Sequence, residues 1–285
     1  MYHYQSLENI DISHIHQSFL DAFSDYVMPM NISLEQFRRL LKRRGYQAKN
    51  SVGVFQNDQL IGFVLTSTRQ WQNTPTTYII GLGLSPKHRG HGLAKVLMQK
   101  AILYNESHTA QFLLEVITSN QPALKLYQSL GYQIGRELLC FSIPKAGLVL
   151  SSSEHITIKI SQHAPSYDLS TFWDKHTSWQ HSPDTLATEP DHFVYVTAYI
   201  NQHIVGYGVI DPASGDIYQL AVHPDYRRQG IASTILSTLC QQTESHKVGY
   251  SNIDASNQSF LEFLQKQKFN HVISQYEMHY SLQAC

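Results

Sequence analysis

The chain has little of three features that commit a sequence to particular protein classes: cysteine, net charge and long apolar runs. Its three cysteines form no Cys-x-x-Cys pair, which excludes a disulfide framework and a cysteine-based zinc site. The formal net charge of −1 leaves no basic surface for nucleic acid or for an anionic membrane. No apolar run approaches the roughly 20 residues that span a bilayer, and residues 1–5 lack a signal-peptide pattern. We expect a cytoplasmic protein with neither a nucleic-acid nor a membrane partner.

Histidine is abundant, but its spacing does not predict a metal site. The 16 histidines are scattered, and neighbours such as His14 and His16 lack the i, i+4 spacing of a helical ligand pair. We expect no bound metal.

One stretch of the chain occurs twice, at residues 82–94 and again at residues 220–232. Three pairs in these stretches lie 138 positions apart: Pro86 and Pro224, Arg89 and Arg227, and Gly92 and Gly230. A length of 285 residues is about twice that of a usual domain. The repeat and the length together predict two domains, which we expect at residues 1–145 and 156–285 with a Ser-rich linker at 146–155.

Each copy is typical of a strand, a glycine-containing loop and a helix. After the first loop, apolar residues recur at helical spacing from Leu93 to Tyr104. Such a loop directs unpaired main-chain amides and the positive end of a helix dipole toward one point. Glycine lets a phosphate approach the main chain closely, so the pattern predicts an anion site.

The rest of the first half alternates helical and strand patterns. Residues 12–24 and 33–44 predict helices, the second opened by a capping box at Ser33. Residues 52–55 and 60–65 predict a hairpin, and residues 70–76 a polar loop. Strands follow at 78–84, 112–117 and 137–143, with a helix from about 93 to 105 and a short helix with a glycine stop over 120–132. Gly81 and Gly83 mark where the first of these strands could part from its neighbour.

The second half repeats this order with drift. Residues 199–209 match the hairpin at an offset of 144, and Asn257 matches Asn120 at an offset of 137. One insertion and one deletion keep the halves aligned.

This order of elements, with an Arg-x-x-Gly-x-Ala loop after Leu84-x-Pro86, resembles the GCN5-related N-acetyltransferase (GNAT) family. The segment from Asn120 through Tyr127 to Tyr132 follows at the family's spacing. Two copies resemble a tandem member. The resemblance implies an α/β (α+β) fold with two tandem acyl-CoA N-acyltransferase domains, each a mixed central sheet flanked by helices.

The resemblance also implies acetyl-CoA (coenzyme A) as the acyl donor, with its diphosphate against the loop. Tyr127 would be the general acid for the departing thiolate. The residues implied to contact acetyl-CoA are Leu82, Leu84, Arg89, Gly90, His91, Gly92, Leu93, Ala94 and Asn120, and in the second copy Val222, Arg227, Arg228, Gln229, Gly230, Ile231 and Ala232.

The general base is left open by the sequence. Many family members place a glutamate on the strand before the loop, but residues 79–83 contain no acid. Glu115 on the next strand is one candidate, although it could equally be a structural carboxylate. Asp25 and Tyr26, in the loop that lines the acceptor cleft of relatives, are others, and water is a fourth.

The two halves differ at the positions of the resemblance. Leu264 stands where the first copy has Tyr127, and Lys268 where it has Gly131. We therefore expect the first domain to catalyse and the second to be partly degenerate. The predicted function is transfer of acetyl to a primary amine of a small acceptor, with a monomer mildly preferred. The alternative is a non-catalytic acyl-CoA binding or sensing protein. A dinucleotide-binding fold fails because no Gly-x-Gly-x-x-Gly run opens a helix.

Overall fold

The computed structural model describes residues 1–28, 30–148, 151–153 and 155–282. The chain forms two compact units: the first comprises Met1–Gly135 and Tyr276–Cys285, and the second Arg136–Gln275. No helix in these described ranges combines the length and apolar character needed to cross a membrane.

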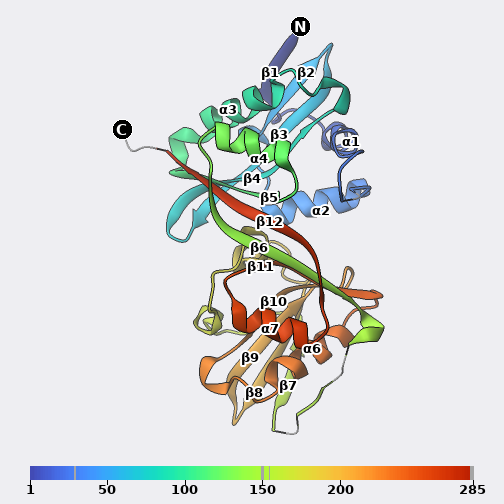
Figure 1. Ribbon diagram of the computed structural model, residues 1–285, viewed down its shortest axis with the longest axis vertical. Coiled ribbons are helices and arrows are strands. Elements are labelled where there is room, and N and C mark those ends of the chain that lie inside the picture. Colours follow the sequence, from blue (N-terminus) through green and yellow to red (C-terminus); the bar gives the residue numbers. More distant parts are fainter. Residues whose placement is uncertain (29, 149–150, 154, 283–285) are drawn as a thin grey trace. The chain divides into compact units, whose positions relative to one another are not determined.

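The first unit is a mixed sheet with helices on both faces (Figure 1). Its strand order is β1-β2-β3-β4-β5-β12. Its helices are α1 (Ile12–Ala22), α2 (Leu34–Arg44), α3 (Leu93–Asn105) and α4 (Gln121–Ser129). Its strands are β1 (Tyr2–Ser6), β2 (Val52–Gln56), β3 (Gln59–Trp71), β4 (Thr74–Leu84), β5 (Gln111–Ile117) and the end of β12 (Asn270–Ser281).

Local sequence signals explain the ends of several elements. Ser33 and Gln36 form the predicted capping box, and Gly45, with φ +75°, ends α2 in the left-handed conformation. The predicted polar loop at 70–76 is wrong. Strands β3 and β4 continue into it and leave only Gln72 and Asn73, with φ 49° and 62°, as the turn. Two left-handed residues match the twist of a tight hairpin.

Strand β4 separates from β5 half-way along its length. The parallel pairing runs from Thr76 with Gln111 to Ile79 with Leu114. Toward β3, the register shifts between Ile79 and Gly81, which makes Ile80 a bulge residue. Strand β4 thus separates from β5 at Ile80, next to Gly81 and Gly83, from which the separation was predicted.

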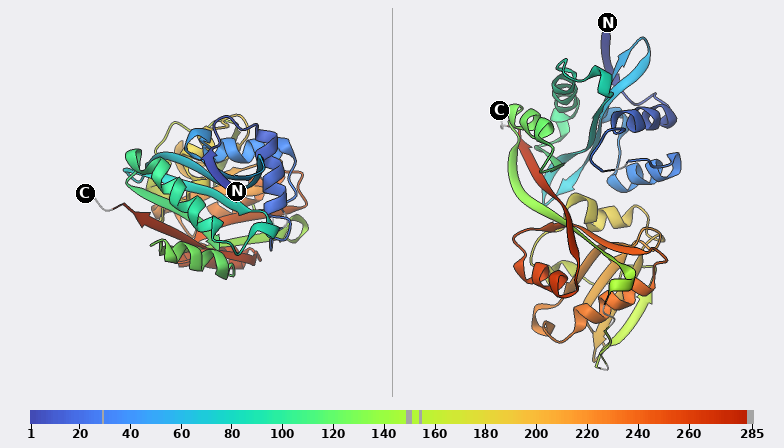
Figure 2. Two further views of the ribbon diagram at one scale, coloured as in Figure 1. Left: turned by 90° about the horizontal axis from the view of Figure 1, so that it is seen from above. Right: turned by 45° about the vertical axis from the view of Figure 1, so that its right-hand side comes forward.

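Helices α3 and α4 lie on one face of this sheet and α1 on the other (Figure 2). Apolar side chains of α3 and α4 pack against the first of these faces. Leu97, Met98 and Phe112 are fully buried in the first of these cores. On the other face, the Phe19 ring lies 4.9 Å from Phe37 and 6.3 Å from Phe63.

The last strand of the first unit comes from the end of the chain. Met278, which is 0% exposed, and Tyr280 pack in its core, and the Leu282 amide donates to the Ala110 carbonyl at 3.0 Å. Strand β6 (Gln133–Pro144) pairs with β11 (Lys247–Asp254) in the second unit. The predicted closing strand at 137–143 thus belongs to the second unit, and the division differs from domains at 1–145 and 156–285. Residues 149, 150 and 154 of the expected linker lie outside the described residues.

The second unit repeats the arrangement with strand order β6-β11-β10-β9-β8-β7. The hairpin predicted at 199–209 is formed by β8 and β9. Only short 3₁₀ turns and α5 (Pro183–Ala187) stand where the first unit has α1 and α2. The remaining elements are β7 (Thr157–Ser161), β8 (Val194–Ile200), β9 (His203–Ile210), β10 (Asp216–Val222), α6 (Ile231–Gln241) and α7 (Gln258–Lys266).

The strands that part in the second unit are β10 and β11. They pair only from Asp216 with Gly249 to Ile217 with Tyr250. Tyr218 is the bulge residue of β10, 138 positions after Ile80. Both units therefore bulge and part at equivalent places.

Candidate active site

The loops that open α3 and α6 have the same backbone conformation. Gly90 and Gly92 have φ of 81° and 75°, and the equivalent Arg228 and Gly230 have φ of 63° and 80°. In the described part of the chain, the amides of residues 90–94 and 228–232 donate no hydrogen bond to another group. An ideal Cβ at Gly90, Gly92 or Gly230 would meet nothing within 4 Å. These open amides at a helix N-terminus fit the predicted anion site.

The side chain of Arg89 is committed to protein acceptors. Its Nη1 and Nη2 donate to the two carboxylate oxygens of Asp25 at 2.8 and 2.9 Å. Nη2 also donates to the Ala22 carbonyl at 2.8 Å, and Nε to the Leu84 carbonyl at 3.1 Å. This clamp ties the end of α1 to the end of β4. It also pairs the Asp25 carboxylate that the sequence assigned to the acceptor.

Arg227 makes the equivalent clamp in the second unit. Its Nε donates to the Val222 carbonyl at 3.0 Å, and Nη1 to Asp174 at 2.9 Å. Nη2 donates to the Phe172 carbonyl at 3.2 Å. The repeated arginine therefore has a repeated structural partner, which the sequence did not reveal because Asp25 and Asp174 lie 64 and 53 residues away.

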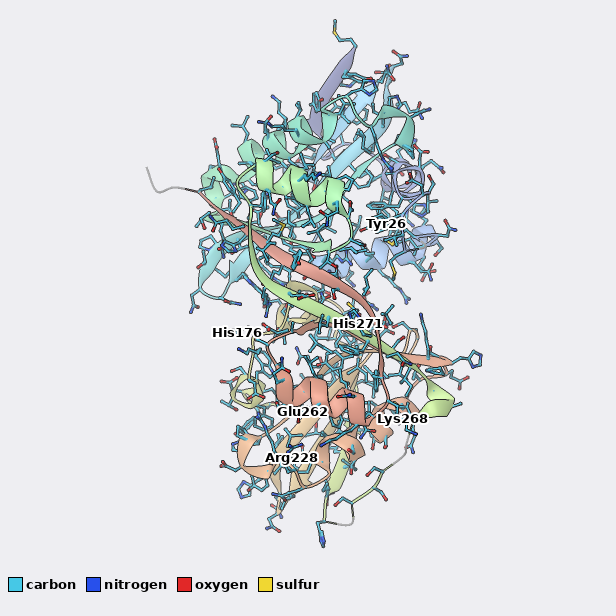
Figure 3. The ribbon with its side chains drawn as sticks, in the orientation of Figure 1. Tyr26, His176, Arg228, Glu262, Lys268 and His271 are labelled. Atoms are coloured by element: carbon cyan, nitrogen blue, oxygen red, sulfur yellow. The ribbon has the colours of Figure 1, made fainter. Side chains whose placement is uncertain are left out.

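Tyr127, Tyr26 and Asn120 come together in the first unit. Asn120 caps α4 by accepting from the Ala123 amide at 3.3 Å. Burial raises the pKa of Tyr26, and a hydrogen bond with Asn120 partly offsets this rise. Burial also raises the pKa of Tyr127, and the nearby Tyr26 adds to the effect. Tyr127 is thus a neutral phenol that keeps its proton. Figure 3 labels Tyr26 on the segment after α1.

Glu115 faces the other side of the sheet from Tyr127. Its neighbours Leu114 and Val116 lie in the core that contains Tyr127, and side chains alternate along a strand. The carboxylate is half-buried on the opposite face. Leu82 and Leu84, expected beside the donor, pack their side chains against the same core as Tyr127, and Leu93 lies in it. His91 is exposed on the loop and Ala94 follows Leu93 in α3.

A cavity of about 500 Å³ adjoins the loop of the second unit. The predicted loop residues that line it are Val222, Arg227, Arg228, Gly230, Ile231 and Ala232; Gln229 is not among them. Arg228 lies 4.0 Å from Glu262 of α7, and Figure 3 labels both. Tyr250 and His181, which no sequence motif indicated, also line the cavity. No group of metal-binding side chains occurs among the residues that the structure describes.

The model of the acetyltransferase (GNAT) family matches residues 13–132 and 159–269. The chain belongs to this family. The two matched regions correspond to the two units, and the fold is the predicted pair of GNAT domains. A comparison with curated protein sequences finds no match.

Solved GNAT structures resemble the whole chain. A GCN5-related N-acetyltransferase from Sphaerobacter thermophilus has a TM-score of 0.75 at 17% identity, covering 98% of this chain and 95% of that one. A tandem GNAT protein from the clavulanic acid biosynthesis pathway has a TM-score of 0.74 at 11% identity, covering 100% of both chains. A glucosamine N-acetyltransferase region of a fungal multi-domain β-N-acetylglucosaminidase has a TM-score of 0.74 at 14% identity, covering 98% of this chain and 38% of that one.

GNAT proteins use an acyl-CoA as co-substrate, and the diphosphate of that co-substrate is an anion of the kind expected at these two loops. A diphosphate accepts hydrogen bonds from main-chain amides and is favoured by the helix dipole. An ideal Cβ at Gly92 or Gly230 would meet nothing within 4 Å, so the space beside the amides of both loops is open to such a group.

Proposed function

We propose that this GNAT protein transfers acetyl from acetyl-CoA to a primary amine of a small acceptor. The observation that carries the proposal is the loop of open amides beside a strand that parts from its neighbour. In the first unit this loop is followed by β5 and α4, which bring Tyr127 to the same core as Leu84 and Leu93.

Tyr127 would act as the general acid. Because burial raises its pKa, the phenol stays protonated throughout the physiological range and can donate to a departing thiolate. Tyr26 would line the acceptor side and Asn120 would flank the thioester; the hydrogen bond between them and the effect of Tyr26 on the pKa of Tyr127 support this proposal.

We assign the general base by excluding the candidate side chains. Arg89 pairs with Asp25, Glu115 faces away from Tyr127, and burial raises the pKa of Tyr26, which keeps that phenol protonated. Deprotonation of the amine is therefore assigned to water.

The test compares Tyr127→Phe with its parent on a panel of small amines, by release of the free CoA thiol, both chains carrying Gly230→Glu in the loop of the second unit so that thiol release reports the first unit alone. We expect kcat to fall about 100-fold, the lower bound for loss of an acid catalyst, with acetyl-CoA affinity unchanged by calorimetry. Tyr104→Phe, an exposed tyrosine of α3, is the control. Binding of acetyl-CoA without thiol release by the wild type would favour a non-catalytic sensor instead. Turnover equal to the parent's in Tyr127→Phe would remove this residue from the mechanism.

A further inference from the structure

Each unit has a tyrosine beside its two separating strands, but the tyrosine occupies a different position in each unit. Sheet register identifies the equivalent positions: Ile79 pairs with Leu114, and Ile217, 138 positions after Ile79, pairs with Tyr250. The first unit thus has Leu114 on its strand and Tyr127 on its helix. The second has Tyr250 on its strand and Leu264, 0% exposed, on its helix.

The Tyr250 hydroxyl lies at the point where β10 and β11 separate. It accepts a hydrogen bond from the Leu220 amide at 3.1 Å. Leu220 is the second residue after the bulge, and both it and Tyr250 line the cavity of about 500 Å³. Among the residues that the structure describes, none accepts the proton of this hydroxyl.

Tyr207, another tyrosine of the same cavity, gives a useful contrast. Its hydroxyl donates to Gln219 at 2.9 Å and accepts from the Trp173 indole, so its hydrogen-bonding capacity serves the protein. Gln219 in turn donates to the His181 carbonyl at 2.7 Å. Tyr207 is therefore a structural tyrosine, whereas the Tyr250 hydroxyl can still donate a hydrogen bond into the cavity.

A bulge in β11 directly follows Tyr250. Between Tyr250 and Ile253 the register with β6 gains one residue, and Asn252 takes φ +58°. The Asn252 side chain donates to Ser178 at 3.1 Å and accepts from Gln275 at 2.8 Å. Bulges commonly redirect a side chain beside an active site. The extra residue also explains why strand positions differ by 136 while the following helices differ by 137.

We propose that the cavity of the second unit is a second acyl-thioester site, in which Tyr250 donates its hydrogen bond to the thioester carbonyl oxygen. This inference rests on the proposed function. The Leu220 amide polarises the phenol from behind, and the Gly230 loop supplies the phosphate amides. On this proposal the second unit is not a degenerate copy, because it has its tyrosine on strand β11 where the first unit has one on helix α4.

The group transfer at this site balances without another reactant. As the amine nitrogen bonds to the carbonyl carbon, an electron pair moves to the oxygen, where the Tyr250 hydrogen bond stabilises the charge. The pair returns as the carbon–sulfur bond breaks, and the proton lost by nitrogen is taken up by sulfur.

The experiment uses the full chain with Gly92→Glu, which places a carboxylate among the amides of the first loop and leaves only the second site. Gly90→Glu serves the same purpose if Gly92→Glu does not fold. Calorimetry should show one equivalent of acetyl-CoA bound, and infrared spectra of bound [1-¹³C]acetyl-CoA should show a carbonyl stretch lowered from its value in solution. Adding Tyr250→Phe should return the stretch toward that value while binding persists, and lower kcat about 100-fold. Tyr199→Phe in β8 is the control.

An unchanged carbonyl stretch in Tyr250→Phe would overturn the role of this hydroxyl. Loss of all binding in both first-loop variants, with the wild type binding one equivalent, would overturn the second site but leave the proposed function intact. Absence of acetyl-CoA binding in the wild type would instead refute the proposed function itself.

Discussion

Arg89 and Asp25 lie 64 residues apart in the sequence and form a two-point ion pair at 2.8 and 2.9 Å. The pair fixes the segment after α1 against the end of β4, next to the loop that begins α3. Arg227 and Asp174 repeat the relationship in the second unit at 2.9 Å. The loop arginine of each unit, Arg89 or Arg227, therefore holds together the segments that surround the loop.

The Arg89–Asp25 pair predicts a specific acid dependence. The hydrogen bond from Arg89 lowers the pKa of Asp25 in the folded state. A carboxyl with a depressed folded pKa stabilises the fold above its unfolded pKa of about 3.9 and loses that contribution as the pH falls through the folded pKa. Asp25→Asn should therefore be less stable than the wild type at neutral pH, and the difference should shrink below about pH 4.

Urea unfolding at a series of pH values measures this difference. Asp21→Asn, on the exposed side of α1, is the matched control. A stability difference between Asp25→Asn and the wild type that stays constant down to the acid limit would contradict the role of the pair.

Because β12 completes the first unit, we expect a core substitution in this strand to destabilise that unit. Met278→Ala removes a fully buried side chain from the core that also contains Leu97 and Phe112. We expect a loss of about 2–5 kcal/mol, the usual range for such truncations. Hydrogen exchange should quicken first in β4 and β5, while β9 and β10 keep their protection.

The reciprocal variant is Ile143→Ala, which lies in the core of the second unit. It should quicken exchange in β10 and β11 first. Met278→Leu conserves volume and should cost less than about 1.5 kcal/mol. If Met278→Ala affected the second unit alone, the assignment of this strand would be wrong.

Burial predicts an unreactive thiol at Cys240. This residue is 1% exposed, and burial raises the pKa of its thiol to about 11. Because the thiolate is the reactive form, alkylation by iodoacetamide at pH 8 should be slow until the protein is unfolded. Mass spectrometry of digested samples gives the rate, and urea-unfolded protein supplies the reference. Rapid labelling of folded protein at pH 8 would contradict this burial.

Some elements could be predicted from the sequence because their signals are local. The Ser33 capping box, the hairpin of β2 and β3 and the loops at 90–92 and 228–230 depend on a few adjacent residues. The hairpin at 70–76 was missed because the polar residues at the partly exposed ends of β3 and β4 resemble a loop, and the two-residue turn at Gln72 and Asn73 lacks glycine.

The amino-acid sequence alone determined the repeat, the two glycine-containing loops and the family's fold, since these depend on glycines and apolar spacing within short segments. Only the tertiary structure decided that β12 completes the first unit and β6 the second, because strands β6 and β12 carry no local signal for either partner. It also decided that Tyr250 stands where the first unit has Leu114. Strand pairing and a bulge at Asn252 set that equivalence, and neither can be read from spacing along the chain.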